Sequence, residues 1–167
     1  SQIFGRITAP GQVYLVNPSG IYFAPSASVE VGSLLATTHD QNNADFMAGR
    51  NTWSRQGATG SILNEGQLRS SLGGYIALLA PEVRNQGLVV AQMGTVVLAA
   101  GEAYTLEFDA AGLLANVVVA PATIKTLVDN GQAVQAPGGL ILLSAQSAYR
   151  LQTGIVQNSG TLQASGL

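Results

Sequence analysis

The chain has 167 residues, of which only 10% are charged, against about 25% in an average soluble domain. Hydrophobic residues make up 47%, which argues against disorder, and the seven cations are spread singly, which argues against nucleic-acid binding. The sequence contains no cysteine, so disulfides and thiolate metal sites are excluded. The length suits one domain, and we expect residues 1–167 to form a single unit.

The composition favours an all-β protein. Twenty of the 167 residues are glycine, and the charged faces typical of amphipathic helices are missing. Apolar residues alternate with polar ones over short runs, as at Val13 and Leu15 or Ile76 and Leu78, which is the spacing of strands. These runs are about half the ~10 residues of a transmembrane-barrel strand, and the apolar runs are far shorter than the ~20 residues of a membrane helix.

A short unit recurs along the chain: Asn or Asp, any residue, Gly, a short strand, a Gly turn and a second strand. In chain order, a partial copy, three complete copies and a cut-off copy span residues 5–15, 64–78, 85–98, 129–143 and 158–166. In the third complete copy Asp129 takes the Asn position. The basic unit is about 21 residues long, and a loop insertion at about 41–61 and an extra-helical insertion at about 101–128 interrupt it.

Strands this short are stable only when neighbouring units stack, so the repeat predicts a β-solenoid with coils ~4.8 Å apart. Glycine permits tight corners, and Asn side chains at equivalent corners would form a ladder of amide hydrogen bonds. The repeat-corner residues singled out in this way are Asn64, Gly66, Gly74, Asn85, Gly87, Gly94, Gly131, Gly139, Asn158 and Gly160.

The sequence indicates no catalytic, metal or cofactor site. His39 is the single histidine and has no partners at metal or triad spacing, so we interpret it as a loop or turn residue. Glu107 and Asp109 fall on one face of a strand, and a solvated face explains them better than paired catalytic carboxylates. For Trp53 two interpretations stay open: a surface contact for a sugar, or a loop residue that covers the solenoid.

Residues Asn17, Pro18, Ser19, Gly20 and Ile21 resemble the Asn-Pro-Asn-Gly-Ile motif of the two-partner secretion domain in filamentous haemagglutinin-like exoproteins, with Ser19 replacing the second Asn. Further elements of that family resemble segments 27–38, 45–49, 73–85 and 97–101, so the resemblance extends across essentially the whole chain.

The resemblance implies a right-handed parallel β-helix at the amino end of a large exoprotein of a Gram-negative bacterium. The domain would cross the periplasm to the cell surface or the medium, recognised by the periplasmic domains of an outer-membrane β-barrel transporter. The family has a further upstream portion, so we expect this chain to be truncated at its amino end. Open coils at both ends would then favour end-to-end self-association.

We therefore expect a non-enzymatic secretion-targeting domain that nucleates β-helix folding outside the cell, with an adhesin as the downstream cargo. For residues 17–21 a structural turn and a direct transporter contact both remain open. The alternative function is an adhesive β-solenoid segment that contacts carbohydrate or a host protein. A polysaccharide-cleaving β-helix would need several acids converging in one groove, and the sequence gives no reason to select them.

Overall fold

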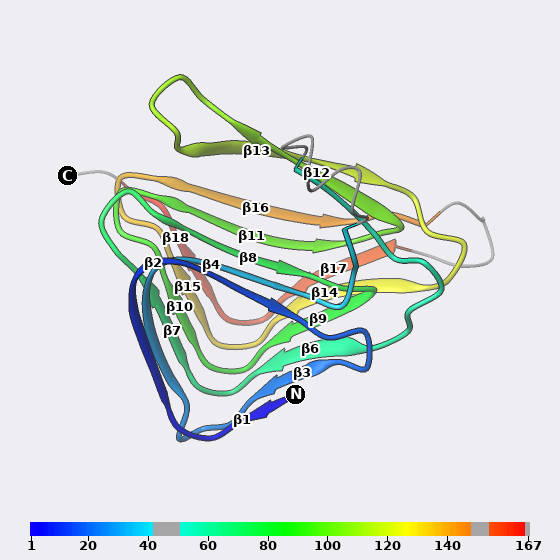
Figure 1. Ribbon diagram of the computed structural model, residues 1–167, viewed down its shortest axis with the longest axis horizontal. Coiled ribbons are helices and arrows are strands. Elements are labelled where there is room, and N and C mark those ends of the chain that lie inside the picture. The colour runs from blue at the N-terminus through cyan, green and yellow to red at the C-terminus, as the bar shows by residue number, and fades with distance from the viewer. Residues whose placement is uncertain (42–50, 148–153, 166–167) are drawn as a thin grey trace.

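The computed structural model describes residues 1–41, 51–147 and 154–165, and every regular element in these ranges is a β-strand. The chain winds in successive coils, and each strand of a coil pairs in parallel with the equivalent strand of the next coil (Figure 1). This confirms the expected all-β architecture of stacked parallel strands. Within the described ranges there is no helix with the length and apolarity to cross a bilayer.

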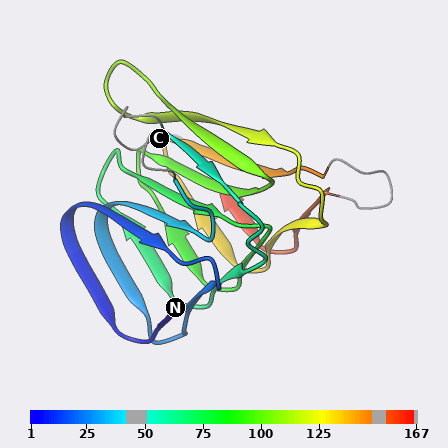
Figure 2. The same ribbon diagram turned by 45° about the vertical axis from the view of Figure 1, so that its right-hand side comes forward.

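Two parallel sheets form three sides around a common interior, as Figures 1 and 2 show. Sheet A contains β1 (Gln2–Ile3), β3 (Ile21–Phe23), β6 (Ser61–Asn64), β9 (Glu82–Asn85), β14 (Thr126–Asn130) and β17 (Gly154–Asn158). The first arm of sheet B contains β7 (Gln67–Ser70), β10 (Leu88–Val90), β15 (Ala133–Gln135) and β18 (Thr161–Gln163). The second arm contains β8 (Tyr75–Leu79), β11 (Thr95–Ala100) and β16 (Leu140–Ala145). The long strands β2 (Arg6–Val16) and β4 (Ser28–Thr37) span both arms.

The interior of the coils is filled by aliphatic side chains that alternate with outward-facing residues along each strand. Ile62, Val83 and Val128 succeed one another in register in sheet A, and all three are fully buried. Such alternation lets strands of three to six residues bury one face completely. The core is therefore a continuous column that passes from coil to coil.

Glycine fills the corner between the two arms of sheet B for a steric reason. A Cβ atom on Gly94 would collide with the carbonyl oxygen of Gly74 one coil earlier. A Cβ atom on Gly139 would collide with the carbonyl oxygen of Gly94 in the same way. The next coil can approach this closely only where the residue has no side chain. These three glycines are among the repeat-corner residues singled out in the sequence.

The corner between sheet A and the first arm carries a ladder of asparagine amides. Asn64, Asn85, Asn130 and Asn158 lie in register in successive coils. The Nδ2 of each donates to the Oδ1 of the next, over 2.9, 2.9 and 2.8 Å. The backbone N–H groups of Gly66 and Gly87 donate to the Oδ1 of the Asn two positions earlier. Polar groups in the buried corner are thus paired with one another.

The alignment of the repeats put Asp129 at the Asn position, and that register is wrong by one residue. Asn130 pairs with Asn85, while Asp129 lies opposite Arg84 and its carboxylate is 3.4 Å from the guanidinium. A carboxylate has no hydrogen to donate to the following coil, whereas an amide does. Gly131 follows Asn130 directly instead of two positions later, and this displaced the alignment of the repeats.

A third sheet lies outside the coils. Sheet C is antiparallel and contains β5 (Thr52–Ser54), β12 (Ala103–Phe108) and β13 (Leu114–Ala120). It covers the outer face of the second arm of sheet B (Figures 1 and 2), and a second apolar core forms between the two layers. Its strands come from two segments that each interrupt the coil repeat, one before β6 and one after β11.

We expect Asn85→Ala to lower the free energy of unfolding by about 3 kcal/mol, because it removes two side-chain donations and leaves buried partners unsatisfied. Urea unfolding monitored by circular dichroism measures the change. The matched control is Asn116→Ala, on the exposed face of β13, which should change stability by less than about 0.5 kcal/mol. Equal effects of the two substitutions would contradict a stabilising role for the ladder.

Candidate functional site

The motif at residues 17–20 forms a closed turn between β2 and β3. The backbone N–H of Gly20 donates to the Asn17 carbonyl over 3.0 Å, and the Ser19 N–H donates to the Asn17 side-chain oxygen over 2.9 Å. Proline fits the second position of such a turn because its φ is fixed. The Pro18 and Ser19 side chains are exposed, whereas the following Ile21 is buried in the core. The turn therefore presents two side chains to the outside.

The turn is held from both neighbouring coils. Asn17 donates through its backbone N–H to the Thr37 carbonyl and through Nδ2 to the Ser1 hydroxyl. Gly60 packs against the turn from the other side: a Cβ there would lie 2.5 Å from both the Pro18 carbonyl oxygen and the Gly20 nitrogen. Gly20 itself has a φ of 111°, which favours glycine. These contacts fix the conformation of the turn on the coil stack.

Beside the turn lies an open hollow of about 310 Å³. It is lined by Ser19, Gly20 and Tyr22 together with residues of the coils before and after, among them Gln2 and Ser61. Gln2 and Tyr22 are partners in the register of β1 and β3, so the hollow is a surface of several adjacent coils. The sequence motif did not reveal Gly60 or Ser61, because the segment before β6 interrupts the repeat spacing that would have placed them.

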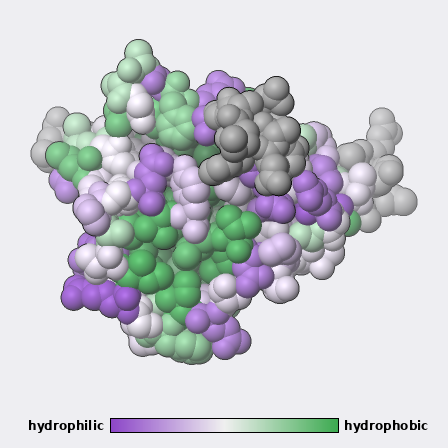
Figure 3. Space-filling model, viewed as in Figure 1, coloured by the Kyte–Doolittle hydropathy of each residue, from purple (hydrophilic) through white to green (hydrophobic). Residues whose placement is uncertain are grey.

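The amino-terminal end of the coil stack is a hydrophobic face. In Figure 3 an apolar area lies at the centre of the view, inside the path traced by β1 and β2 in Figure 1. The half-buried side chains of Ile3, Ile7, Val13 and Leu15 pack against the core from this first coil. Of the described strands, β3 alone pairs with β1 and β4 alone pairs with β2. The outer edge of the first coil is thus unpaired by any described strand.

Trp53 lies in β5 with only 6% of its surface exposed, so its side chain is buried and is not presented on the surface. It packs in the core between sheet C and the coils, and the Tyr14 ring lies 6.0 Å away in an edge-on arrangement. Glu107 and Asp109 are exposed, and the Asp109 carboxylate accepts the backbone N–H groups of Ala111 and Leu113. Within the described ranges, no three His, Cys, Asp or Glu residues are grouped closely enough to hold a metal ion.

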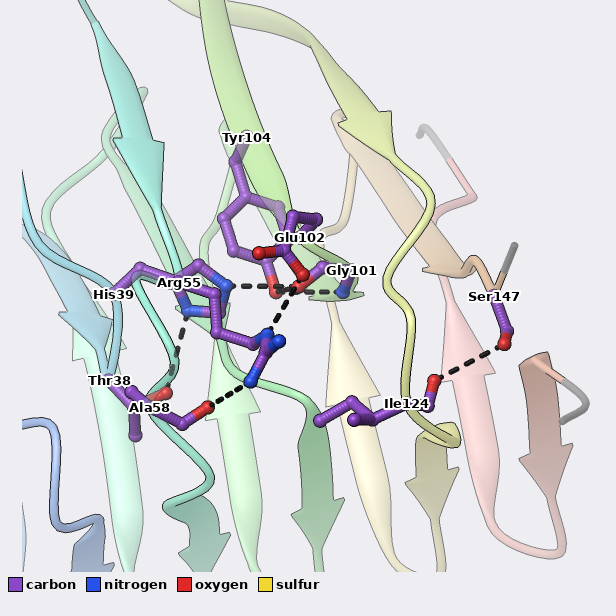
Figure 4. A network of polar contacts seen from close by, with 9 residues as sticks. All are labelled: Thr38, His39, Arg55, Ala58, Gly101, Glu102, Tyr104, Ile124 and Ser147. Atoms are coloured by element: carbon purple, nitrogen blue, oxygen red, sulfur yellow. Dashed lines mark hydrogen bonds and ion pairs between the residues drawn. The ribbon is translucent and has the colours of Figure 1, made fainter. Parts of the chain in front are cut away.

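His39 occupies an unexpected place. It follows β4 in a bend, yet its side chain is completely buried between the coils and sheet C. Its Nε2 lies 2.9 Å from the Gly101 carbonyl oxygen, and the Tyr104 ring is 4.5 Å away (Figure 4). Burial lowers the pKa of His39 to about 4, so the imidazole is neutral at physiological pH. The sequence indicated that His39 lies in a loop or turn, but it did not indicate that the side chain is buried.

An ion pair lies in the same network. The Arg55 Nε is 2.9 Å from a Glu102 carboxylate oxygen, and the Arg55 Nη1 donates to the Ala58 carbonyl (Figure 4). The Arg55 side chain is 10% exposed and that of Glu102 is 37% exposed. This cluster joins residues far apart in the chain, and its contacts link the segment before β6 to the segment after β11, which indicates structural support of sheet C.

Comparison with known proteins identifies the family. The model of the TPS secretion domain matches residues 1–167. A Haemophilus influenzae strain Rd protein named heme/hemopexin-binding protein is 29% identical over 153 residues, covering 87% of this chain and 16% of that protein. A second H. influenzae protein of the same name is 30% identical over 191 residues, covering 99% of this chain and 20% of that protein. The chain therefore spans a fifth or less of these relatives.

The fold is also similar to a solved structure. The crystal structure of the HMW1 secretion domain from Haemophilus influenzae superposes with a TM-score of 0.80, at 23% identity, over 100% of this chain and 46% of that one. At 23% identity this similarity is evidence for the fold alone. Because the family model covers the chain from end to end, the chain belongs to the TPS, or two-partner secretion, domain family.

Proposed function

We propose that this chain is the secretion-targeting domain of a larger exoprotein and that the periplasmic domains of an outer-membrane β-barrel transporter recognise it. The observation that carries the proposal is the family match over all 167 residues. The protein would pass through the periplasm of a Gram-negative bacterium to the cell surface or the medium. The domain would act without catalysis, as one right-handed β-helical unit over residues 1–167 with insertions at about 41–61 and 101–128.

We place the contact with the transporter at residues 17–21. Pro18 and Ser19 are exposed, the turn is rigidly held by neighbouring coils, and the hollow beside it offers hydroxyl groups and backbone to a partner. Asn17, Gly20 and Ile21 would serve mainly to fix the turn, because their groups are engaged within the protein. Recognition and turn formation are then two properties of the same five residues.

Outside the cell, the folded coils would nucleate the folding of the sequence that follows. The strands of each coil present unpaired backbone groups to the next coil, so a finished coil is a template for parallel pairing. For the cargo, the names of the two curated relatives favour a protein that binds heme or hemopexin over the adhesin expected from sequence. The alternative function, an adhesive solenoid segment, is not favoured because the family match accounts for the whole chain.

The transporter contact is tested with two proline substitutions that differ only in place. Pro18 lies in the turn 17–20, and Pro25 lies in the turn 24–27, which is also closed by a backbone hydrogen bond and also exposes a Pro-Ser pair. We expect Pro18→Glu to weaken binding to the transporter's periplasmic domains roughly tenfold, about 1.4 kcal/mol, and Pro25→Glu to leave it within about twofold. Isothermal titration calorimetry measures both, and thermal unfolding checks that both variants fold.

Equal affinities for the original chain and both variants would contradict a contact at residues 17–21. Equal losses of affinity in Pro18→Glu and Pro25→Glu would also contradict it, because binding would then depend on coil corners in general and not on residues 17–21.

We further propose that the open coils associate end to end. The first coil carries half-buried apolar side chains beside a strand edge that no described strand pairs, which favours pairing with another chain. Sedimentation velocity should show concentration-dependent oligomers, and Val13→Lys should reduce them at least about tenfold because a charge then replaces an apolar contact at the end face. Val118→Lys, at a residue 50% exposed on sheet C, is the control and should leave association unchanged. A monomer at every concentration would contradict the proposal.

A further inference from the structure

The two segments that build sheet C leave the coil stack at neighbouring points. One leaves after β4, through Thr38 and His39, and the other leaves after β11, through Gly101 and Glu102. The contact between His39 and Gly101 joins these two exits directly, over 62 positions of sequence. In Figure 4 the His39 side chain lies at the base of sheet C, between the exits. A change at this one side chain therefore acts on both connections.

The hydrogen bonds of His39 suit the neutral imidazole better than the charged one. The Gly101 carbonyl can only accept, so Nε2 carries the hydrogen, and Nδ1 is left as an acceptor. In the part of the chain that the structure describes, the hydrogen-bond partner found for Nδ1 is the Thr38 hydroxyl oxygen, at 3.5 Å, and the Glu102 backbone gives the ring a further weak stabilisation of its charged form. A proton on Nδ1 would need a good acceptor at this position, and the long contact to a hydroxyl supplies a poor one. Protonation would thus place a positive charge in a buried site with an inadequate partner.

The surrounding groups offer only partial compensation. Glu102 favours the charged imidazole, but its carboxylate is already paired with Arg55, whose positive charge opposes protonation. The Tyr104 hydroxyl accepts the Gly101 N–H and donates to the Gly101 carbonyl, and burial raises the pKa of Tyr104, so this ring stays neutral. Among the described residues, these are the titratable and charged groups that face His39.

We propose that His39 is an acid-operated latch: its protonation releases sheet C from the coils while the coils themselves stay folded. Release would expose the apolar outer face of the second arm of sheet B, which includes Leu35, Ala77 and Val97. The latch acts locally because His39 and its partners lie at the exits to sheet C, outside the interior column and the asparagine ladder that join coil to coil. In a secretion domain this would make the outer layer sensitive to the pH of its compartment.

The sign of the effect follows from the two protonation equilibria. In the open state the imidazole is hydrated and binds a proton near its ordinary pKa of 6.5, whereas in the closed state burial lowers the pKa to about 4. Between these values protons bind preferentially to the open state, so closing becomes less favourable as the pH falls. From about pH 7.5 to about pH 5 the opening equilibrium should shift roughly 30-fold towards the open state.

The test is hydrogen exchange resolved by residue, expressed as protection factors so that the pH dependence of intrinsic exchange is removed. We expect the protection of β12 and β13 amides to fall roughly 30-fold between about pH 7.5 and about pH 5, and that of β9 and β10 amides to change far less. In His39→Gln the side-chain amide can still donate to the Gly101 carbonyl but does not titrate, so the fall in β12 should be lost. A merely structural role would lower protection at every pH and leave its pH dependence intact.

A second measurement keeps the proposal testable if His39→Gln fails to fold. His39 is the sole histidine, so its imidazole signal in NMR spectra is unambiguous, and it should titrate near pH 4. Titration near 6.5, an unchanged pH dependence in His39→Gln, or equal loss of protection in β9 and β12 would each overturn the latch. Transporter binding plays no part in these measurements, so they are independent of the proposed secretion role.

Discussion

The coil stack, on which the rest of the described structure rests, depends on parallel pairing between successive coils. The strands of the coils are mostly three to six residues long, and strands this short are stabilised by the hydrogen bonds they make to neighbouring coils. Close approach of the backbones is the condition for that pairing. It explains why glycine occupies the corner of sheet B. There the carbonyl oxygen of one coil lies where a side chain on the next coil would have to be. It also explains why a buried polar corner is built from amides, which both donate and accept.

The same constraint shapes the features that concern function. The turn at residues 17–20 is a coil corner whose backbone is held by the coils on either side, and it carries two exposed side chains. Sheet C departs from the repeat, since it is antiparallel and is joined to the coils by side-chain packing and by the polar cluster around His39. The stack supports both the turn and the outer sheet, and each of them presents something other than a repeated strand.

Much of the fold could be predicted from sequence because the residues that define the repeat each act within their own strand or corner. Alternating aliphatics, corner glycines and recurring asparagines indicated stacked short strands, and the motif at 17–21 indicated the family. The register of Asn130 could not be read, because the shifted Gly131 made Asp129 look equivalent. The burial of His39 and Trp53 was also hidden: both lie in segments that interrupt the repeat, and their environment comes from residues such as Tyr104 and Tyr14 that are distant in sequence. Contacts made by insertions leave no periodic signal.

The secretion role is tested most directly by export of the complete exoprotein from cells that make its outer-membrane transporter. Immunoblots of medium, cell surface and periplasm should be compared for the intact exoprotein and for a version that lacks residues 1–167. If these residues are the secretion address, the intact protein is found outside the cell and the deleted version stays in the periplasm. Export of the deleted version at the level of the intact protein would contradict the assignment.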